Sequence, residues 1–362
     1  MSIISILIFI IILLILVMVH ELGHFIVAKL TGCRVDEFAF GFPPTIWKKK
    51  IGETEYKFNA IPIGGYVKIW GEDGSNHHDK RMFTNRPKWA QISVLIAGVM
   101  MNWLLAFFIF FILAKSSMLA SASDPQYASQ ITNPKLIIES VNKNGPAYHA
   151  GIREGYEITQ IVANGKTANL KDSNTVRDFL VANIDADIKI KWTNGNDKGD
   201  SVVTGVYGIN KDKKAIGIAF DVLGNLKLDF VDSFKYALKR VYVYTVETFG
   251  GLAELGRGIM TANRDTLNGV SGPVGIAKIV GQQAAHGSLA DVALLAAILS
   301  INLAVFNLLP FPALDGGRII MVIYEAIMKK KIKHSVASAI NGVGFMALIL
   351  LLVVVTINDI FK

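Results

Sequence analysis

Five residues near the amino terminus have the types and the spacing of a metal site. Positions 20 to 24 read His-Glu-Leu-Gly-His, which is the pattern H-E-x-x-H. On a helix, side chains four residues apart lie on one face, so the imidazoles of His20 and His24 can bind one Zn²⁺ ion. Glu21 then lies beside the metal, where it can take a proton from a zinc-bound water. The pattern predicts one Zn²⁺ per chain with Glu21 as general base, and a structural cluster of polar side chains between helices is the alternative.

A catalytic zinc ion usually has three protein ligands, so a third is expected elsewhere in the chain. The best candidate is Asp315, in the segment 307–318, which reads NLLPFPALDGGR. Pro310 and Pro312 cannot continue a helix, and unwound backbone at membrane depth requires surrounding protein or a water-filled cavity. The sequence therefore predicts that Asp315 is a zinc ligand on an irregular turn. The alternative is a helix-breaking loop in which Asp315 caps the next helix.

Both motifs lie in or beside apolar segments that are long enough to cross a bilayer. Of the 362 residues, 52% are hydrophobic and 18% are charged, whereas a soluble domain has about 25% charged residues. This composition excludes a disordered chain, and a single cysteine, Cys33, excludes an intrachain disulfide. Spans are expected at residues 3–19, continued as helix to residue 30, and at 90–114, 292–309 and 335–357. No basic residue precedes the first span and no small-residue cleavage site follows it, so we interpret it as a membrane helix and not as a signal peptide.

The basic residues predict how these spans are oriented, because Lys and Arg near span ends mark the cytoplasmic side. They gather between residues 29 and 88 and between residues 318 and 333. Those two loops are expected in the cytoplasm, and the termini and residues 115–289 on the other side. Topology and anionic membrane lipid then explain the net charge of +8, and no nucleic-acid partner is needed.

Together the two motifs resemble those of the site-2 proteases, a family of intramembrane zinc metalloproteases (peptidase family M50). Within it, the chain is similar to the bacterial regulator of sigma-E protease group (RseP type). The resemblance rests on residues 20–24, on the N-x-x-P-x-P-x-L-D-G pattern from Asn307, and on the segments 58–68 and 271–277. Two positions depart from the family pattern. Pro43 stands where the first cytoplasmic loop often has Gly, and Val99 stands where the second span often has Pro.

The resemblance implies that His20, His24 and Asp315 bind zinc and that Glu21 is general base and general acid. It also implies that Asn307 holds the substrate, or the developing oxyanion, beside the unwound segment. The family hydrolyses peptide bonds within or near the transmembrane helices of other proteins. The implied substrates are single-pass membrane proteins, such as an anti-sigma factor already trimmed outside the membrane, and also signal-peptide remnants. The implied location is the bacterial cytoplasmic (inner) membrane.

The segment between the second and third spans has the composition of a soluble domain. Residues 147–150 predict a short helix closed by Gly151, residues 158–162 a strand, and Asn164-Gly165 a tight hairpin turn. A helix at 174–183 and strands at 188–192 and 201–207 are expected to follow. This resembles one PDZ domain, about residues 134–223, in which Ile216-Gly217-Ile218 would capture a peptide C-terminus through backbone N–H groups. The alternative is a sheet that only filters access to the protease.

Two more segments are expected to lie against the membrane. Residues 229–250 have apolar positions at helical spacing with interleaved Lys and Arg, which predicts an interfacial helix. Residues 55–58 and 66–70 could pair as a hairpin near the active site. Its exposed edge, at Gly65 and Tyr66, could bind an unwound substrate by strand addition. The alternative there is a plain loop.

The sequence thus predicts an α-helical polytopic membrane protein with four transmembrane helices, a membrane-associated β-hairpin and one inserted α+β PDZ domain. The expected boundaries are 1–30, 90–114, 289–318 and 335–357 for the transmembrane segments, 31–89 and 319–334 for cytoplasmic loops, 115–224 for the PDZ domain and 225–288 for the interfacial segment. The candidate substrate-binding residues are Asn307, Pro310, Pro312, Gly65 and Tyr66. Two other functions fit the same motifs: a non-catalytic membrane-anchored PDZ scaffold, and a membrane-anchored protease with a different third ligand.

Overall fold

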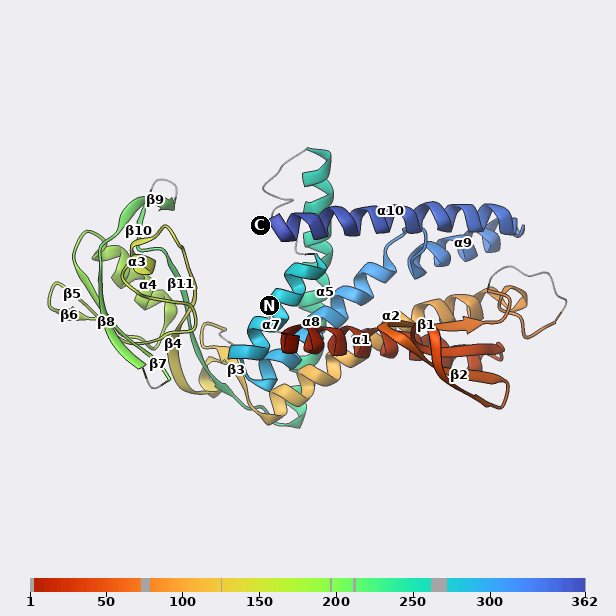
Figure 1. Cartoon of the computed structure of the whole chain (residues 1–362). Helices are drawn as coiled ribbons and strands as arrows, with labels where there is room; N and C mark the ends of the chain where they lie inside the picture. The colour runs from red at the N-terminus through yellow and green to blue at the C-terminus, as the bar shows by residue number, and fades with distance from the viewer. Residues whose placement is uncertain are drawn as a thin grey trace. The chain divides into compact units, whose positions relative to one another are not determined.

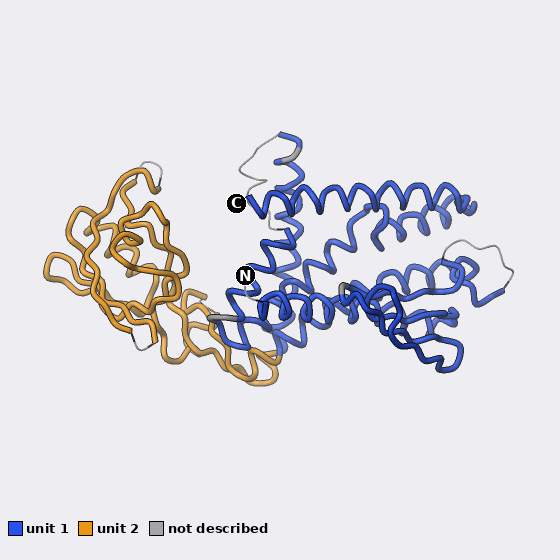
Figure 2. The backbone as a smooth tube through the Cα atoms, viewed as in Figure 1, with its two compact units in different colours: residues 1–111, 234–362 blue, residues 112–233 orange. Residues whose placement is uncertain are grey.

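A computed structural model describes residues 3–72, 79–124, 126–195, 197–210, 213–261 and 272–361. The chain divides into two compact units (Figure 2). Unit 1 comprises residues 1–111 and 234–362, and unit 2 comprises residues 112–233. Ser271, the first residue of one of the motif segments, lies outside the described residues.

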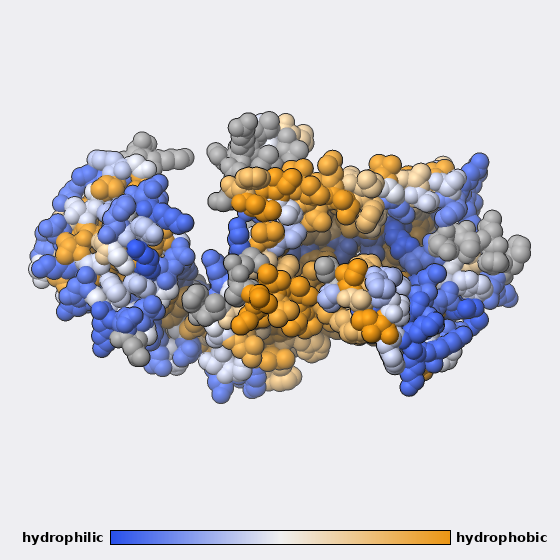
Figure 3. Space-filling view, in the orientation of Figure 1, coloured by the Kyte–Doolittle hydropathy of each residue, from blue (hydrophilic) through white to orange (hydrophobic). Residues whose placement is uncertain are grey.

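In the part of the chain that the structure describes, four helices are long and apolar enough to cross a membrane (Figure 1). They are α1 (Ile3–Leu30), α2 (Lys88–Ser116), α8 (Leu289–Leu308) and α10 (His334–Phe361). Three of them cover a predicted span in full, and α8 covers the predicted span 292–309 except for its last residue, which confirms the four helical segments. On the face that Figure 3 shows, apolar residues dominate the surface over α1 and much of α10, as expected of helices that face lipid.

Clusters of buried side chains hold the helices of unit 1 together, and α8 takes part in two of them. In the first, Leu16 of α1 packs with Val280 of α7 (Pro273–His286) and with partly buried side chains of α8. In the second, Phe110 of α2 packs with Ile301 of α8 and Ala237 of α5 (Phe230–Met260). Helix α8 contributes to both clusters, so it links α1 to α2 and α5.

Helix α5 is amphipathic, as residues 229–250 predict, but it continues ten residues beyond the predicted end to Met260. Gly250 and Gly251 do not end it because no proline follows them before residue 260, and an isolated glycine pair only weakens a helix. Ala237 on one face is fully buried, whereas Phe234 and Leu238 are exposed. Its interfacial position stays a prediction.

The first loop folds into a twisted antiparallel pair, β1 (Val35–Ile51) and β2 (Thr54–Ile69). Residues 37–40 of β1 pair with residues 65–68 on one side and with residues 55–58 on the other. The predicted direct pairing of 55–58 with 66–70 is therefore wrong, because β1 inserts between them. Aromatic cross-strand contacts favour this arrangement: the rings of Phe40 and Phe58 stack with their centroids 4.5 Å apart.

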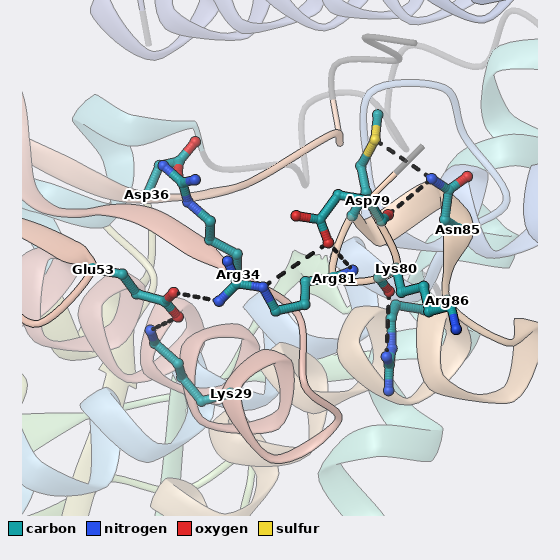
Figure 4. A network of polar contacts seen from close by, with 10 residues as sticks. Lys29, Arg34, Asp36, Glu53, Asp79, Lys80, Arg81, Asn85 and Arg86 are labelled. Atoms are coloured by element: carbon teal, nitrogen blue, oxygen red, sulfur yellow. Dashed lines mark hydrogen bonds and ion pairs between the residues drawn. The ribbon is translucent and has the colours of Figure 1, made fainter. Parts of the chain in front are cut away.

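Ion pairs fasten this sheet to the helices (Figure 4). Glu53, in the turn between β1 and β2, accepts hydrogen bonds of 2.8 Å from Lys29 at the end of α1 and from Arg81. Arg81 lies just before the short 3₁₀ helix η1 (Phe83–Asn85) that leads into α2. The sheet is thus tied to both helices that enclose the candidate site.

Unit 2 is a mainly antiparallel β structure with two helices. Its large sheet has the strand order β3-β11-β4-β5-β7-β8, with β6 paired to β5, and β9 and β10 form a separate hairpin. The strands are β3 (Met118–Ser121), β4 (Ile131–Val141), β5 (Glu157–Ala163), β6 (Lys166–Thr167), β7 (Ile188–Asn194), β8 (Asp197–Val203), β9 (Val206–Asn210), β10 (Lys213–Ala215) and β11 (Ile218–Leu226). The helices are α3 (Pro146–His149) and α4 (Ser173–Ala182), and a 3₁₀ turn, η2, covers Ala128–Gln130.

Most local predictions in this unit are confirmed. The short helix α3 and the helix α4 lie where expected, and Asn164 and Gly165 both have positive φ, at 50° and 71°, in the turn between β5 and β6. The predicted strand 201–207 is confirmed only in part: residues 201–203 belong to β8 and residues 206–207 to β9, with a break between them. The chain leaves the sheet after Val203, because the N–H of Gly205 donates to the carbonyl of Ile184 instead of to a neighbouring strand.

Asp221 of β11 joins three parts of unit 2. Its Oδ1 accepts hydrogen bonds from the hydroxyls of Ser173 and Ser123 at 2.5 and 3.0 Å and from the N–H of Val222 at 2.8 Å. Partial burial raises the pKa of this carboxyl, but the hydrogen bonds from Ser121, Ser173, Val222 and Ser123 outweigh it and hold the pKa below its usual range. The ionised carboxylate therefore stabilises the start of α4 against β11.

We predict that Asp221→Asn loosens α4 and β11 at neutral pH, by about 1 kcal/mol in local opening free energy, because charge-assisted hydrogen bonds become neutral ones. Hydrogen–deuterium exchange of the full chain in detergent, followed at residues 173–182 and 218–226, measures this. Because the folded pKa is depressed, the stabilisation in the wild type is present above the unfolded pKa and is lost as the pH falls through the lower, folded pKa. Equal exchange in the variant and the wild type at pH 7 would contradict the role of Asp221.

Candidate metal centre

Three predicted ligands from two distant parts of the chain meet inside unit 1. Nε2 of His20 and Nε2 of His24 lie 3.1 Å apart, and they lie 3.0 and 3.3 Å from Oδ2 of Asp315. The two histidine side chains are buried. Among the described residues this is the group that could hold a metal ion, with all its ligand atoms within 4.8 Å of one another.

The helical spacing of His20 and His24 in α1 accounts for half of this geometry. The other half comes from the chain between α8 and α9 (Asp315–Met328), which is unwound from Leu309 to Leu314. Asp315 is the first residue of α9, and Leu314 occupies the N-cap position. The alternative in which Asp315 caps the helix is therefore wrong.

The double glycine after Asp315 lets α9 begin directly against the unwound segment. A Cβ atom on Gly316 would lie 2.2 Å from the carbonyl oxygen of Leu309, and one on Gly317 would lie 2.2 Å from that of Phe311. Asn341 of α10 steadies the same segment, because its Oδ1 accepts a 3.2 Å hydrogen bond from the N–H of Ala313. Ala313 has a φ of 71°, which is uncommon for a residue with a side chain.

Glu21 is held by the sheet and not by another side chain. Its Oε2 accepts a 3.0 Å hydrogen bond from the N–H of Val67 in β2. Residues 65–68 pair with β1 on one edge, so this N–H belongs to the other edge of the strand. The candidate general base therefore takes its orientation from the edge of the sheet.

A cavity of about 280 Å³ contains the cluster. Its wall includes His20, Glu21, His24 and Asp315, together with Tyr66 and Asn307 from the candidate substrate-binding set. Gly65 and the two prolines do not line this cavity: Gly65 is buried against β1, Pro312 packs against Gly344 of α10, and Pro310 is exposed. Ile216, Gly217 and Ile218 belong to unit 2.

The comparison with known proteins decides the family. The model of peptidase family M50 matches residues 8–351. The chain belongs to this family, the site-2 proteases. It is 36% identical to a protein of Clostridium perfringens over 95% of each chain. It is also 32% identical to one of Fusobacterium nucleatum over 96% of each, and 31% identical to one of Clostridium acetobutylicum over 96% of this chain and 94% of the relative.

All three relatives carry the name "putative zinc metalloprotease". With the four apolar helices, the family shows that this site-2 protease is a membrane protein and a zinc-dependent metalloprotease that acts within the membrane. A purely non-catalytic PDZ scaffold is thereby set aside.

The cluster fits a zinc ion. Ligand atoms about 2.0–2.2 Å from a tetrahedral zinc lie about 3.3–3.6 Å apart. The three separations here, 3.0, 3.1 and 3.3 Å, lie at or slightly below the lower end of that range, so a small outward shift of the side chains would admit the ion. Oδ2 of Asp315 is buried, and within the described residues it has no hydrogen bond of acceptable geometry. A buried carboxylate oxygen of this kind is costly unless a cation binds it. His20, His24 and Asp315 would thus hold the zinc of the site-2 protease.

Helix α2 supplies residues that the sequence reasoning missed. The carbonyl of Val94 lies 2.8 Å from Nδ1 of His24, and Asn102 lies beside Nδ1 of His20. Between them, Gly98 faces the ligand atoms themselves: a Cβ atom there would lie 2.4 Å from Nε2 of His24 and 2.8 Å from Nε2 of His20. Asn102 is a polar residue inside an apolar span. A polar side chain costs free energy at membrane depth, and this was the signal that could have identified it from the sequence.

Glu72 and Arg318 were also missed. They form an ion pair that links the chain after β2 to α9, three residues beyond Asp315, and both line the cavity. No spacing rule connects residues so far apart in the sequence, so only the tertiary structure reveals the pair.

We predict that Gly98→Ala lowers bound zinc from about one ion per chain to less than about a tenth, since its methyl group occupies the space of the ligand atoms. Elemental analysis of the detergent-purified protein measures the content. Gly250→Ala is the matched control, because nothing lies within 4 Å of a Cβ atom built there. Full zinc occupancy in Gly98→Ala would show that α2 does not confine the ligands.

Proposed function

We propose that this site-2 protease cleaves single-pass membrane proteins within their transmembrane segments. The proposed substrates are an anti-sigma factor already trimmed outside the membrane and, in addition, signal-peptide remnants. One observation carries the proposal: His20, Glu21 and His24 lie in α1, a helix apolar enough to span the membrane, so the bond that reaches them must also lie at membrane depth.

The chemistry follows from the side chains around the cavity. A zinc ion bound here would polarise the scissile carbonyl and lower the pKa of a water molecule. Glu21 takes the proton of that water and delivers it to the departing nitrogen, as general base and then general acid. The Val67 N–H holds the Glu21 carboxylate in place for both transfers. Asn307, on the cavity wall, donates to the substrate carbonyl or to the oxyanion that develops from it.

The substrate must unwind before it reaches Glu21, because a helix satisfies its own backbone groups and shields its peptide bonds. The edge of residues 65–69 away from β1 offers those groups new partners by strand addition. Gly65 and Tyr66 lie on that strand, and Tyr66 borders the cavity. Pro310 and Pro312 act indirectly, because they prevent a helix from forming over residues 309–314.

We further propose that unit 2 is a PDZ domain that binds the C-terminus of a trimmed substrate. Its helix α3, its tight turn at residues 164–165 and its helix α4 support this assignment, as does the Φ-Gly-Φ sequence Ile216-Gly217-Ile218 at the start of β11. The carbonyls of Ile216 and Gly217 accept hydrogen bonds from Ala147 and Asn142, which fixes the loop. Its backbone N–H groups would receive the peptide carboxylate.

The proposed setting is the bacterial cytoplasmic membrane. The basic loops 29–88 and 318–333 would lie on the cytoplasmic side, and both termini and unit 2 on the outer side. Anionic lipid would contact the basic loops.

We expect Glu21→Gln to keep about one zinc per chain and to lower cleavage of a transmembrane substrate by at least about a hundredfold, since the proton acceptor is lost while the ligands remain. Asp315→Ala should lose both zinc and cleavage. Zinc content and cleavage are measured on the same proteoliposome samples, with a trimmed and an untrimmed anti-sigma factor side by side.

Preferential cleavage of the trimmed form supports the proposed substrate. A fully active Glu21→Gln would refute the proposed mechanism. Unchanged zinc affinity in Asp315→Ala would assign the third ligand to another residue.

The orientation can be tested with cysteine labelling, because Cys33 is the only cysteine in the chain and is buried. In a Cys33→Ala background, single cysteines replace the exposed residues Lys49 of β1 and Lys166 of unit 2. A membrane-impermeant maleimide added to intact spheroplasts should label position 166, and should label position 49 only after lysis. Labelling of position 49 in intact cells would reverse the proposed orientation.

A further inference from the structure

We propose that Asn102 is a positioning residue for the zinc site: its side-chain carbonyl oxygen accepts a hydrogen bond from Nδ1–H of His20 and fixes the tautomer in which Nε2 binds the metal. The inference rests on the zinc-binding role of His20 and His24 and on no property of the substrate. It concerns residues of α1 and α2, which the helix packing brings together from 82 positions apart.

The two histidines must be in the same tautomer to bind one metal. Their Nε2 atoms converge with Asp315, so each Nε2 must offer its lone pair and each Nδ1 must carry the proton. For His24 the structure fixes this directly. Its Nδ1 lies 2.8 Å from the carbonyl oxygen of Val94, and a carbonyl can only accept.

For His20 the corresponding partner is Asn102, whose side-chain Nδ2 is placed 3.3 Å from Nδ1. Asn102 is fully buried, and its Oδ1 has no hydrogen-bond partner among the described residues. The two ends of the amide have almost the same shape and exchange places by a half-turn about the Cβ–Cγ bond. After that half-turn, Oδ1 accepts a hydrogen bond from Nδ1–H of His20. In the opposite orientation, the NH₂ group of Asn102 would face the N–H group of His20, and two donors would meet.

The spacing on α2 shows that this is one arrangement and not two isolated contacts. Val94, Gly98 and Asn102 are four residues apart and lie on one face of α2. They meet His24 and His20 of α1 in antiparallel order: Val94 contacts His24, Asn102 contacts His20, and Gly98 leaves room for the ligand atoms between them. A backbone carbonyl orients one imidazole and a side-chain amide orients the other.

The backbone of Asn102 has a separate contact with α8. The hydroxyl of Ser300 in α8 donates a 2.8 Å hydrogen bond to the backbone carbonyl of Asn102. This contact holds the backbone of Asn102 but does not touch His20. Ser300 therefore offers a variant that disturbs the same residue without altering the amide.

The test compares three variants of the full chain in detergent. Asn102→Leu keeps the size and removes the acceptor, Asn102→Asp keeps an acceptor and removes the donor, and Ser300→Ala is the control. Zinc affinity is measured by competition with a chelator, and the cobalt-substituted protein is compared by its visible absorption, which reports the coordination geometry. Each variant also carries Glu21→Gln, so that self-cleavage does not affect the samples.

Asn102→Leu should bind zinc about 10- to 100-fold more weakly than the parent. Asn102→Asp should stay within about threefold of the parent or bind more tightly, and it should keep the cobalt spectrum, because a carboxylate also accepts from Nδ1–H. Ser300→Ala should match the parent in both measurements.

Two results would overturn the inference. One is parental zinc affinity in Asn102→Leu. The other is an Asn102→Asp variant as weak as Asn102→Leu, since that would mean that Asn102 donates to His20; this arm remains decisive if Asn102→Leu does not fold. Absence of zinc from the parent itself would instead refute the proposed function.

Discussion

Two imidazoles and a carboxylate buried among apolar helices form the constraint on which the rest of unit 1 depends. Polar and ionisable side chains at membrane depth are costly unless they pair with one another or bind a cation. His20, His24 and Asp315 meet this condition by converging on one point, with ligand atoms 3.0 to 3.3 Å apart. A zinc ion, on which the family depends, would turn a destabilising cluster into a stabilising one if it bound here.

Convergence requires chain segments that no single helix could supply. Helix α1 provides two ligands at a spacing of four residues, but the third lies almost three hundred residues later, at the start of α9. Helix α8 ends at Leu308, and the chain then passes close to α10, where Oδ1 of Asn341 accepts a hydrogen bond from the N–H of Ala313. The Asn341 side chain gives this unwound backbone a hydrogen-bond partner of the kind that irregular backbone at membrane depth needs.

The sheet adds a link between chemistry and substrate binding. The strand that gives its Val67 N–H to Glu21 is also the one that we propose to bind substrate, and the ion pair of Glu53 with Lys29 ties this sheet to α1. The Glu72–Arg318 pair joins the end of the sheet to the helix of the third ligand. The proposed general base, the proposed ligands and this strand are thus connected to one another. A displacement of the sheet would therefore move the carboxylate of Glu21.

Local pattern was sufficient for much of this protein. Hydropathy determined the four spans, the i, i+4 rule determined the pairing of His20 with His24, and two prolines beside Asp315 determined where a span must unwind. Turn residues with fixed φ preferences determined the hairpin at Asn164-Gly165. Each of these follows from interactions within a few residues, which a sequence states directly.

The tertiary structure decided the contacts between distant segments. Only helix packing brings Asn102 and Gly98 to the histidines, and only cross-strand pairing places residues 37–40 between 55–58 and 65–68, against the simple hairpin that the sequence suggested. The N–H that orients Glu21 is a backbone group, and every residue except proline has one, so no residue type in the sequence indicates it. The sequence alone therefore identifies the side chains that could do the chemistry. The groups that orient those side chains depend on how α1, α2 and the sheet pack together.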